Sequence, residues 1–132
     1  MSSPADAFTR GMEVRRQVLG DEYVDAAVAA TTPFTRRFQD LITRYAWGEI
    51  WSTPDLDLQT RSRMTITALI ALGRFDELEM HVRAAVRLGL TPRDIEEVLL
   101  HSAIYCGVPA ANAAFKVAQR VLAEMDALAA SG

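Results

Sequence analysis

His81 is the residue of this sequence best suited to acid–base chemistry, and it is one of only two histidines. An imidazole titrates near neutral pH, so it can donate a proton or a hydrogen bond to a reacting group. Arg74 and Glu77 lie two turns and one turn before it, which places the three side chains on one side of a helix. The alternative is an ordinary histidine at the edge of a buried face, and periodicity by itself favours that alternative.

Two arginines, Arg61 and Arg63, begin the preceding expected helix. Guanidinium groups beside the free N–H groups of a helix N-terminus suit a carboxylate ligand. The alternative is that they pair with Asp55 or Asp57 at the surface. The spacing does not separate these two interpretations.

Aromatic residues are dense over residues 45–51, where Trp47 and Trp51 could form a wall of a small-molecule pocket. Such stripes at helical spacing are more often part of a core. Cys106 is the only cysteine, which excludes an internal disulfide and a dithiol redox centre. No metal site is expected, because His81 and His101 fall on different helices with no carboxylate at ligand spacing.

Composition predicts a single helical domain over residues 1–132. Half of the residues are apolar, and glycine and proline are sparse. The net charge of −3 argues against a nucleic-acid partner. The start of the chain has no signal-peptide pattern and no apolar run reaches membrane-spanning length, so we expect a soluble cytoplasmic protein with no membrane partner.

The patterning predicts an all-α protein of six to seven helices. Their expected ranges are about 4–19, 21–30 with Asp21 as cap, 33–51, 58–72 with Asp57 as cap, 76–88, 92–104 and 110–128. The helix over 58–72 is apolar almost all round, so it must be buried in the core of a domain or of an assembly. This surplus of apolar surface predicts a homo-oligomer.

Five segments of the chain resemble the carboxymuconolactone decarboxylase family, within the alkylhydroperoxidase-like superfamily. They read R-R-Q-V-L-G-D-E-Y-V-D, T-P-F-T-R-R-F-Q-D-L-I-T-R-Y-A-W-G-E-I-W, R-S-R-M-T-I-T-A-L-I-A-L-G-R, E-L-E-M-H-V-R-A-A-V and E-E-V-L-L-H-S-A-I-Y-C-G-V-P-A-A-N-A-A-F. The resemblance implies an all-α bundle assembled as a ring-like homo-oligomer, a hexamer. It also implies decarboxylation of 4-carboxymuconolactone to the β-ketoadipate enol-lactone, in the protocatechuate branch of the β-ketoadipate pathway.

The peroxidase relatives in that superfamily carry the pattern C-x-x-C-x-x-x-H. With their histidine placed on His81, Arg74 and Glu77 stand where the two cysteines would be. This difference disfavours a thiol or peroxide oxidoreductase, which remains one alternative. A decarboxylase of a related lactone and a non-catalytic binding protein on the same scaffold are the others.

The implied substrate can serve as its own electron sink, because the electrons of the departing carboxylate can flow to the lactone carbonyl. No cofactor is therefore expected. The resemblance leads us to assign His81 as proton donor or oxyanion partner, with Glu49 or Glu77 orienting or reprotonating it. The other expected roles are substrate carboxylate binding by Arg61 and Arg74, with Arg63 and Arg83 in reserve, and exclusion of water by Trp47, Trp51 and Tyr105.

Overall fold

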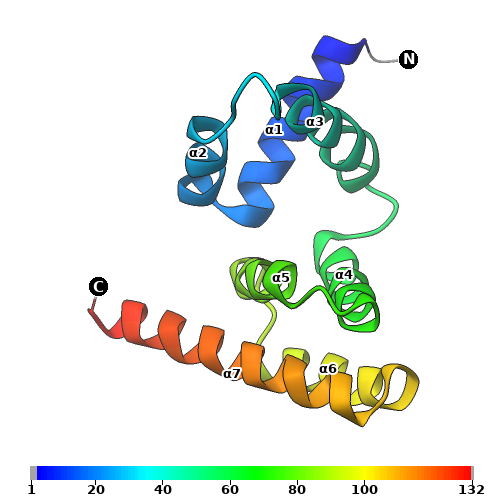
Figure 1. The fold of residues 1–132 in the computed structure, drawn as a ribbon, viewed down its shortest axis with the longest axis vertical. Coiled ribbons are helices and arrows are strands. Elements are labelled where there is room, and N and C mark those ends of the chain that lie inside the picture. The colour runs from blue at the N-terminus through cyan, green and yellow to red at the C-terminus, as the bar shows by residue number, and fades with distance from the viewer. Residues whose placement is uncertain (1–2, 132) are drawn as a thin grey trace. The chain divides into compact units, whose positions relative to one another are not determined.

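The computed structural model describes the backbone of residues 3–131 and the side chains of residues 3–126, and these residues form no strand. Figure 1 shows the helices in chain order. They are α1 (Pro4–Leu19), α2 (Asp21–Ala29), α3 (Arg36–Ile42), the π-helix η1 (Thr43–Trp51), α4 (Leu58–Leu72), α5 (Phe75–Arg87), α6 (Pro92–Cys106) and α7 (Val108–Ser131). The all-α prediction is confirmed.

The helices fall into two compact units. The N-terminal unit runs to Leu58 and contains α1, α2, α3 and η1, whereas the C-terminal unit starts at Gln59 and contains α4 to α7. The expectation of one domain over residues 1–132 stays a prediction.

In the N-terminal unit, α1 packs chiefly against η1. Glycines make this contact close, since a Cβ on Gly11 would collide with the Thr43 carbonyl oxygen and one on Gly48 with the Ala7 carbonyl oxygen. The Gly48 carbonyl oxygen accepts hydrogen bonds from Arg10 Nε at 2.8 Å and from Ser52 Oγ at 2.6 Å. These bonds hold the middle of η1.

The helix expected over residues 33–51 differs from the observed structure. Thr32 and Thr35 close a turn by exchanging hydrogen bonds between side chain and backbone, so the helix begins only at Arg36. From Thr43 the chain continues as a π-helix, which the patterning did not predict. Side-chain periodicity did not signal this change. π-helical turns are rare, and they frequently occur at functional sites.

In the C-terminal unit, α5, α6 and α7 pack around one apolar core that also takes one face of α4. Ile66 and Ile70 of α4 join this core, together with Leu78 and Val82 of α5. The opposite face of α4 is open, and Leu72 is 72% exposed. The helices of this unit therefore cover only one face of α4, and burial of the other face in the core of an assembly stays a prediction.

Capping explains several helix ends. Ser3 and Thr91 each form a capping box with the acid three residues later, so α1 and α6 begin where predicted. Asp21 is not a cap: it is the first residue of α2, and Gly20 occupies the cap position. The expected interruption over 105–109 is confined to Gly107, whose φ of 96° reverses the chain, and α7 begins at Val108 rather than Ala110.

Within the described residues, none of the helices combines the length and hydropathy needed to span a bilayer.

The contact of α1 with η1 predicts an unusual response to a Gly→Ala change. In an open helix, alanine is about 1 kcal/mol more favourable than glycine. At Gly11 the added methyl group meets the backbone of Thr43, so we expect Gly11→Ala to lower the free energy of unfolding by about 2 kcal/mol. Urea unfolding measures this difference.

Gly73→Ala is the matched control, because Gly73 has a φ of 71° with nothing near its missing Cβ. Only the backbone penalty of about 1–2 kcal/mol should appear there. A Gly11→Ala protein as stable as the wild type would contradict the close packing of α1 on η1.

Candidate active site

His81 lies in the middle of α5 and is only 8% exposed. Leu78, Val82 and Ala85 are fully buried on the same helix. Leu78 lies three residues before His81 and Ala85 lies four residues after it, so these side chains share one face with the imidazole. The amphipathic pattern of α5 thus turns the imidazole inward with the apolar side chains. The prediction that His81 lies at the buried face rather than in open solvent is confirmed.

Burial lowers the pKa of His81 from 6.5 to about 4, because the charged imidazolium loses its hydration. The carboxylate of Glu77, one turn earlier, acts in the opposite direction but is the weaker effect. His81 is therefore neutral at pH 7 in this structure. A neutral imidazole has one donor and one acceptor nitrogen, so it can hydrogen-bond a developing oxyanion.

Glu77 and Arg74 lie at the start of α5, and both are exposed. Arg74 occupies the cap position, with Asp76 and Glu77 in the first turn. Among the residues whose side chains the structure describes, no carboxylate forms an ion pair with Arg74. Its guanidinium is thus available to an anion from solution.

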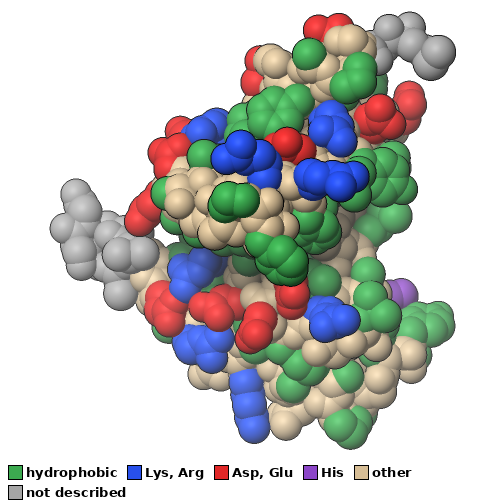
Figure 2. Space-filling view, turned by 45° about the horizontal axis from the view of Figure 1, so that its top comes forward, with side chains coloured by type: hydrophobic (Ala, Val, Ile, Leu, Met, Phe, Trp, Pro, Cys, Tyr) green, Lys and Arg blue, Asp and Glu red, His purple; other side chains and the backbone are tan. Residues whose placement is uncertain are grey.

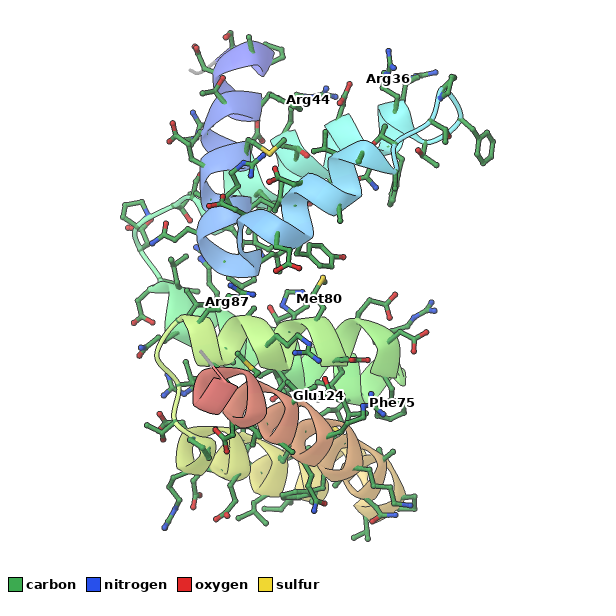
Figure 3. All side chains as sticks on the ribbon, turned by 90° about the vertical axis from the view of Figure 1, so that its left-hand side faces the viewer. Arg36, Arg44, Phe75, Met80, Arg87 and Glu124 are labelled. Atoms are coloured by element: carbon green, nitrogen blue, oxygen red, sulfur yellow. The ribbon has the colours of Figure 1, made fainter. Side chains whose placement is uncertain are left out.

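The other candidate arginines differ in their partners. Arg61 is half-buried in the first turn of α4. Arg63 lies 3.8 Å from a carboxylate oxygen of Asp94 in α6, rather than beside the expected Asp55 or Asp57. Arg83 forms ion pairs with Glu79 and with Glu124 of α7, which Figure 3 labels beside α5.

Three predicted site residues, Trp47, Glu49 and Trp51, lie on η1 in the N-terminal unit. The two indole rings contact each other, with centroids 4.9 Å apart, and Trp47 is buried. Glu49 is exposed. Arg10 and Ser52 donate hydrogen bonds to the carbonyl oxygen of Gly48, which lies between Trp47 and Glu49. These bonds hold the backbone at this point.

Tyr105 lies near the end of α6 and is 76% exposed. Its ring contacts that of His101, with centroids 5.2 Å apart. The structure therefore brings Glu77 close to His81, and Trp47 close to Trp51, whereas the contact that it describes for Tyr105 is with a residue outside the predicted set.

Sequence reasoning missed a buried cation, Arg15 of α1, which is 5% exposed. Its guanidinium donates to two neutral oxygens, those of Thr43 at 3.4 Å and Gln39 at 3.3 Å, and burial lowers its pKa. The pattern of α1 contained the signal, since Arg15 follows Gly11 by one turn on the buried face and precedes Val18.

The residues that the structure describes contain no group of three histidine, cysteine or acidic side chains placed to bind a metal ion. Cys106 is a free thiol at the end of α6.

The buried imidazole predicts how stability depends on pH. The unfolded chain binds a proton near pH 6.5, whereas the folded chain resists it until about pH 4, so acid favours unfolding. Above pH 6.5 the imidazole is neutral in both states, so its burial costs no stability there. As the pH falls from 6.5 to about 4, the free energy of unfolding should fall by about 3 kcal/mol. Urea unfolding of the wild type and of His81→Asn across pH 4–7 measures the difference.

Parallel curves for the wild type and His81→Asn would show that burial of His81 does not oppose its protonation.

Comparison with known proteins places this geometry in a family. The model of the "Carboxymuconolactone decarboxylase family" matches residues 36–120, which include α3 to α6, His81 and every candidate arginine. A 4-carboxymuconolactone decarboxylase of Acinetobacter baylyi is 44% identical over 118 residues, covering 89% of this chain and 88% of the relative. A nitrosuccinic acid decarboxylase of Metarhizium robertsii is 43% identical over 118 residues, covering 89% and 82%. With its buried histidine helix inside the matched region, the chain belongs to the carboxymuconolactone decarboxylase family.

Proposed function

We propose that this protein is a carboxy-lyase that converts 4-carboxymuconolactone to the β-ketoadipate enol-lactone in the protocatechuate branch of the β-ketoadipate pathway. The observation that carries the proposal is the 44% identity to a 4-carboxymuconolactone decarboxylase along 89% of the chain. The neutral, buried His81 supports it physically, because it supplies a hydrogen-bond donor in a site of low polarity.

The reaction breaks the bond between the ring and its carboxylate, which leaves as carbon dioxide. The bonding electrons flow through the ring double bond to the lactone carbonyl oxygen, which becomes an oxyanion. Return of these electrons and uptake of one proton at a ring carbon give the enol-lactone. The substrate holds its own electron sink, so the protein must bind anions, stabilise the oxyanion and deliver a proton.

His81 suits the last two tasks in succession. As a neutral imidazole it donates a hydrogen bond to the oxyanion. Negative charge close to an imidazole raises its pKa, so a bound dianion reverses part of the effect of burial and favours protonation. Glu77 acts in the same direction from one turn away, and we assign it, or alternatively Glu49, to orient and reprotonate His81.

Arg61 and Arg74 are proposed to bind the two substrate carboxylates. Compared with Arg74, the reserves Arg63 and Arg83 are less suitable because each already lies beside a carboxylate of the chain. Trp47, Trp51 and Tyr105 are assigned to the exclusion of water, which strengthens the electrostatic interactions of a site. Of these three side chains, Trp47 has the burial that such a role needs.

A second candidate substrate is nitrosuccinic acid, because a decarboxylase of that acid is almost equally similar to this chain. A nitro group next to the departing carboxylate accepts the electron pair as a lactone carbonyl does. Both substrates are dianions that supply their own sink, so the same arginines and histidine could serve either. The thiol peroxidase alternative is supported less well, since Cys106 is the only cysteine.

We also propose that several copies assemble, since large apolar side chains are exposed on both units. The proposed number of six copies rests on the family resemblance. A cytoplasmic location is proposed from the single reduced cysteine.

The direct test offers both acids to the purified protein and follows carbon dioxide release and product formation. We expect turnover of 4-carboxymuconolactone, with His81→Asn lowering kcat by about 10²–10⁴-fold because the donor to the oxyanion is lost. His101→Asn, the exposed control, should keep wild-type kcat. Full activity in a folded His81→Asn protein would refute the role of His81, and turnover of nitrosuccinic acid alone would replace the proposed substrate.

The arginine assignments predict a change in substrate binding. Arg61→Met and Arg74→Met should each raise KM for the dianion by about 10-fold or more, since each loses a charge-assisted bond to a carboxylate. Arg93→Met is the matched control, because that side chain is 78% exposed and pairs with acids of its own helix. An unchanged KM would exclude the substituted arginine from the carboxylate site.

A further inference from the structure

A surface of the N-terminal unit combines exposed apolar and basic side chains. On α3 and the first turn of η1, Phe38, Leu41 and Tyr45 follow one another at steps of three and four and are 50–60% exposed. Arg37 and Arg44 flank them and share a surface hollow of about 460 Å³ with Phe38 and Leu41. We name these five residues the basic stripe.

The basic stripe carries an excess of positive charge. Among the described side chains, no carboxylate lies within ion-pair distance of Arg37 or Arg44. Asp40 lines the same hollow, so the two arginines and this carboxylate together carry a net charge of +1. Figure 3 labels Arg44 on this unit, together with Arg36, a third arginine of α3.

The C-terminal unit carries a surface of the opposite sign. An open groove of about 860 Å³ runs between α4 and α6, and we name it the acidic groove. The apolar side chains that line it include Met64, Ala68, Ala71, Leu100 and Ile104. Its charged residues are Arg63, Asp94 and Glu97, which leave one excess negative charge when His101 is neutral.

The acidic groove has an apolar floor that is open to solvent. Ile104 is 74% exposed and Met64 is 58% exposed, so its apolar floor has no cover within the chain. Ala68 and Ala71 are small and leave room for large side chains between α4 and α6. A helix that binds in a groove presents apolar anchors at steps of three and four, as Phe38, Leu41 and Tyr45 do.

The two surfaces also agree in length. The basic stripe extends from Arg37 to Tyr45, which is about 12 Å of helix at about 1.5 Å per residue. The charged and apolar residues of α6 in the groove extend from Asp94 to Ile104, which is about 15 Å. Figure 2 shows that hydrophobic side chains lie among basic and acidic ones on the face that it draws.

We propose that the basic stripe of one copy of this chain binds in the acidic groove of a second copy. Arg37 and Arg44 would then lie against the excess negative charge of the groove, while Phe38, Leu41 and Tyr45 cover its apolar floor. The contact joins two different surfaces, so it is heterologous, and repetition closes a ring when the rotation allows it. It rests on the proposed assembly of several copies and names the surfaces that form it.

This contact explains why α4 is apolar almost all round although the chain covers only one of its faces. Ile66 and Ile70 belong to the core of the C-terminal unit. Met64, Ala68 and Ala71 would belong to the interface, so the assembly removes from water what the single chain leaves exposed.

Charge reversal on either surface tests the proposal. The stripe variant Arg37→Glu/Arg44→Glu makes both surfaces negative, and the groove variant Glu97→Arg makes both positive. Each should raise the dissociation constant of the assembly by about 10-fold or more, since like charges then face each other. Sedimentation velocity of the full chain measures the mass, and far-UV circular dichroism checks the fold.

The rescue experiment identifies the pair of surfaces. An equimolar mixture of the two variants, and one chain carrying all three substitutions, should regain the wild-type mass, because opposite charges face each other again. Glu22→Arg/Lys116→Glu, which reverses one charge of each sign outside both surfaces, should leave the mass unchanged.

A wild-type chain that assembles while both variants keep its mass, or variants that dissociate without rescue, would overturn the proposed contact and leave the proposed hexamer standing. A wild-type chain that is monomeric at every concentration would overturn both.

Discussion

Desolvation of the His81 imidazole is the constraint on which the proposed chemistry depends. The face of α5 that holds Leu78 and Val82 in the core also holds His81 out of water, and this lowers its pKa to about 4. The protein thus keeps a neutral donor close to neutral pH, at a cost in stability that appears only in acid. Glu77 moderates the effect from the exposed end of the same helix.

The same electrostatic reasoning separates the arginines. Arg63 and Arg83 lie beside acidic residues of other helices, so their charges contribute to holding α4, α5, α6 and α7 together. Arg74 has no such partner among the described side chains and lies at the N-terminus of the histidine helix, where the helix dipole also favours an anion. Arg15 shows a third arrangement, in which neutral Thr43 and Gln39 oxygens solvate a buried guanidinium.

In the N-terminal unit, close packing at two glycines holds η1 against α1. Gly11 and Gly48 let the backbones of α1 and η1 approach, and the approach allows Arg10 to reach the Gly48 carbonyl oxygen. The π-helical backbone that carries Trp47, Glu49 and Trp51 is therefore held from α1 as well as by its own hydrogen bonds. A site residue on η1 depends on two helices for its position.

The all-α class and most helix ends could be predicted from the sequence, because capping boxes, glycine stops and periodicity are local signals. Thr91 and Asp94 determine the start of α6 by themselves, whereas no residue type signals the π-helix of residues 43–51. Family resemblance singled out His81 as the histidine proposed to be functional, and periodicity placed it at the buried face. Only the tertiary structure determined how strongly burial shifts its pKa, which arginines have acidic partners and which face of α4 stays open, because these depend on packing between helices distant in the chain.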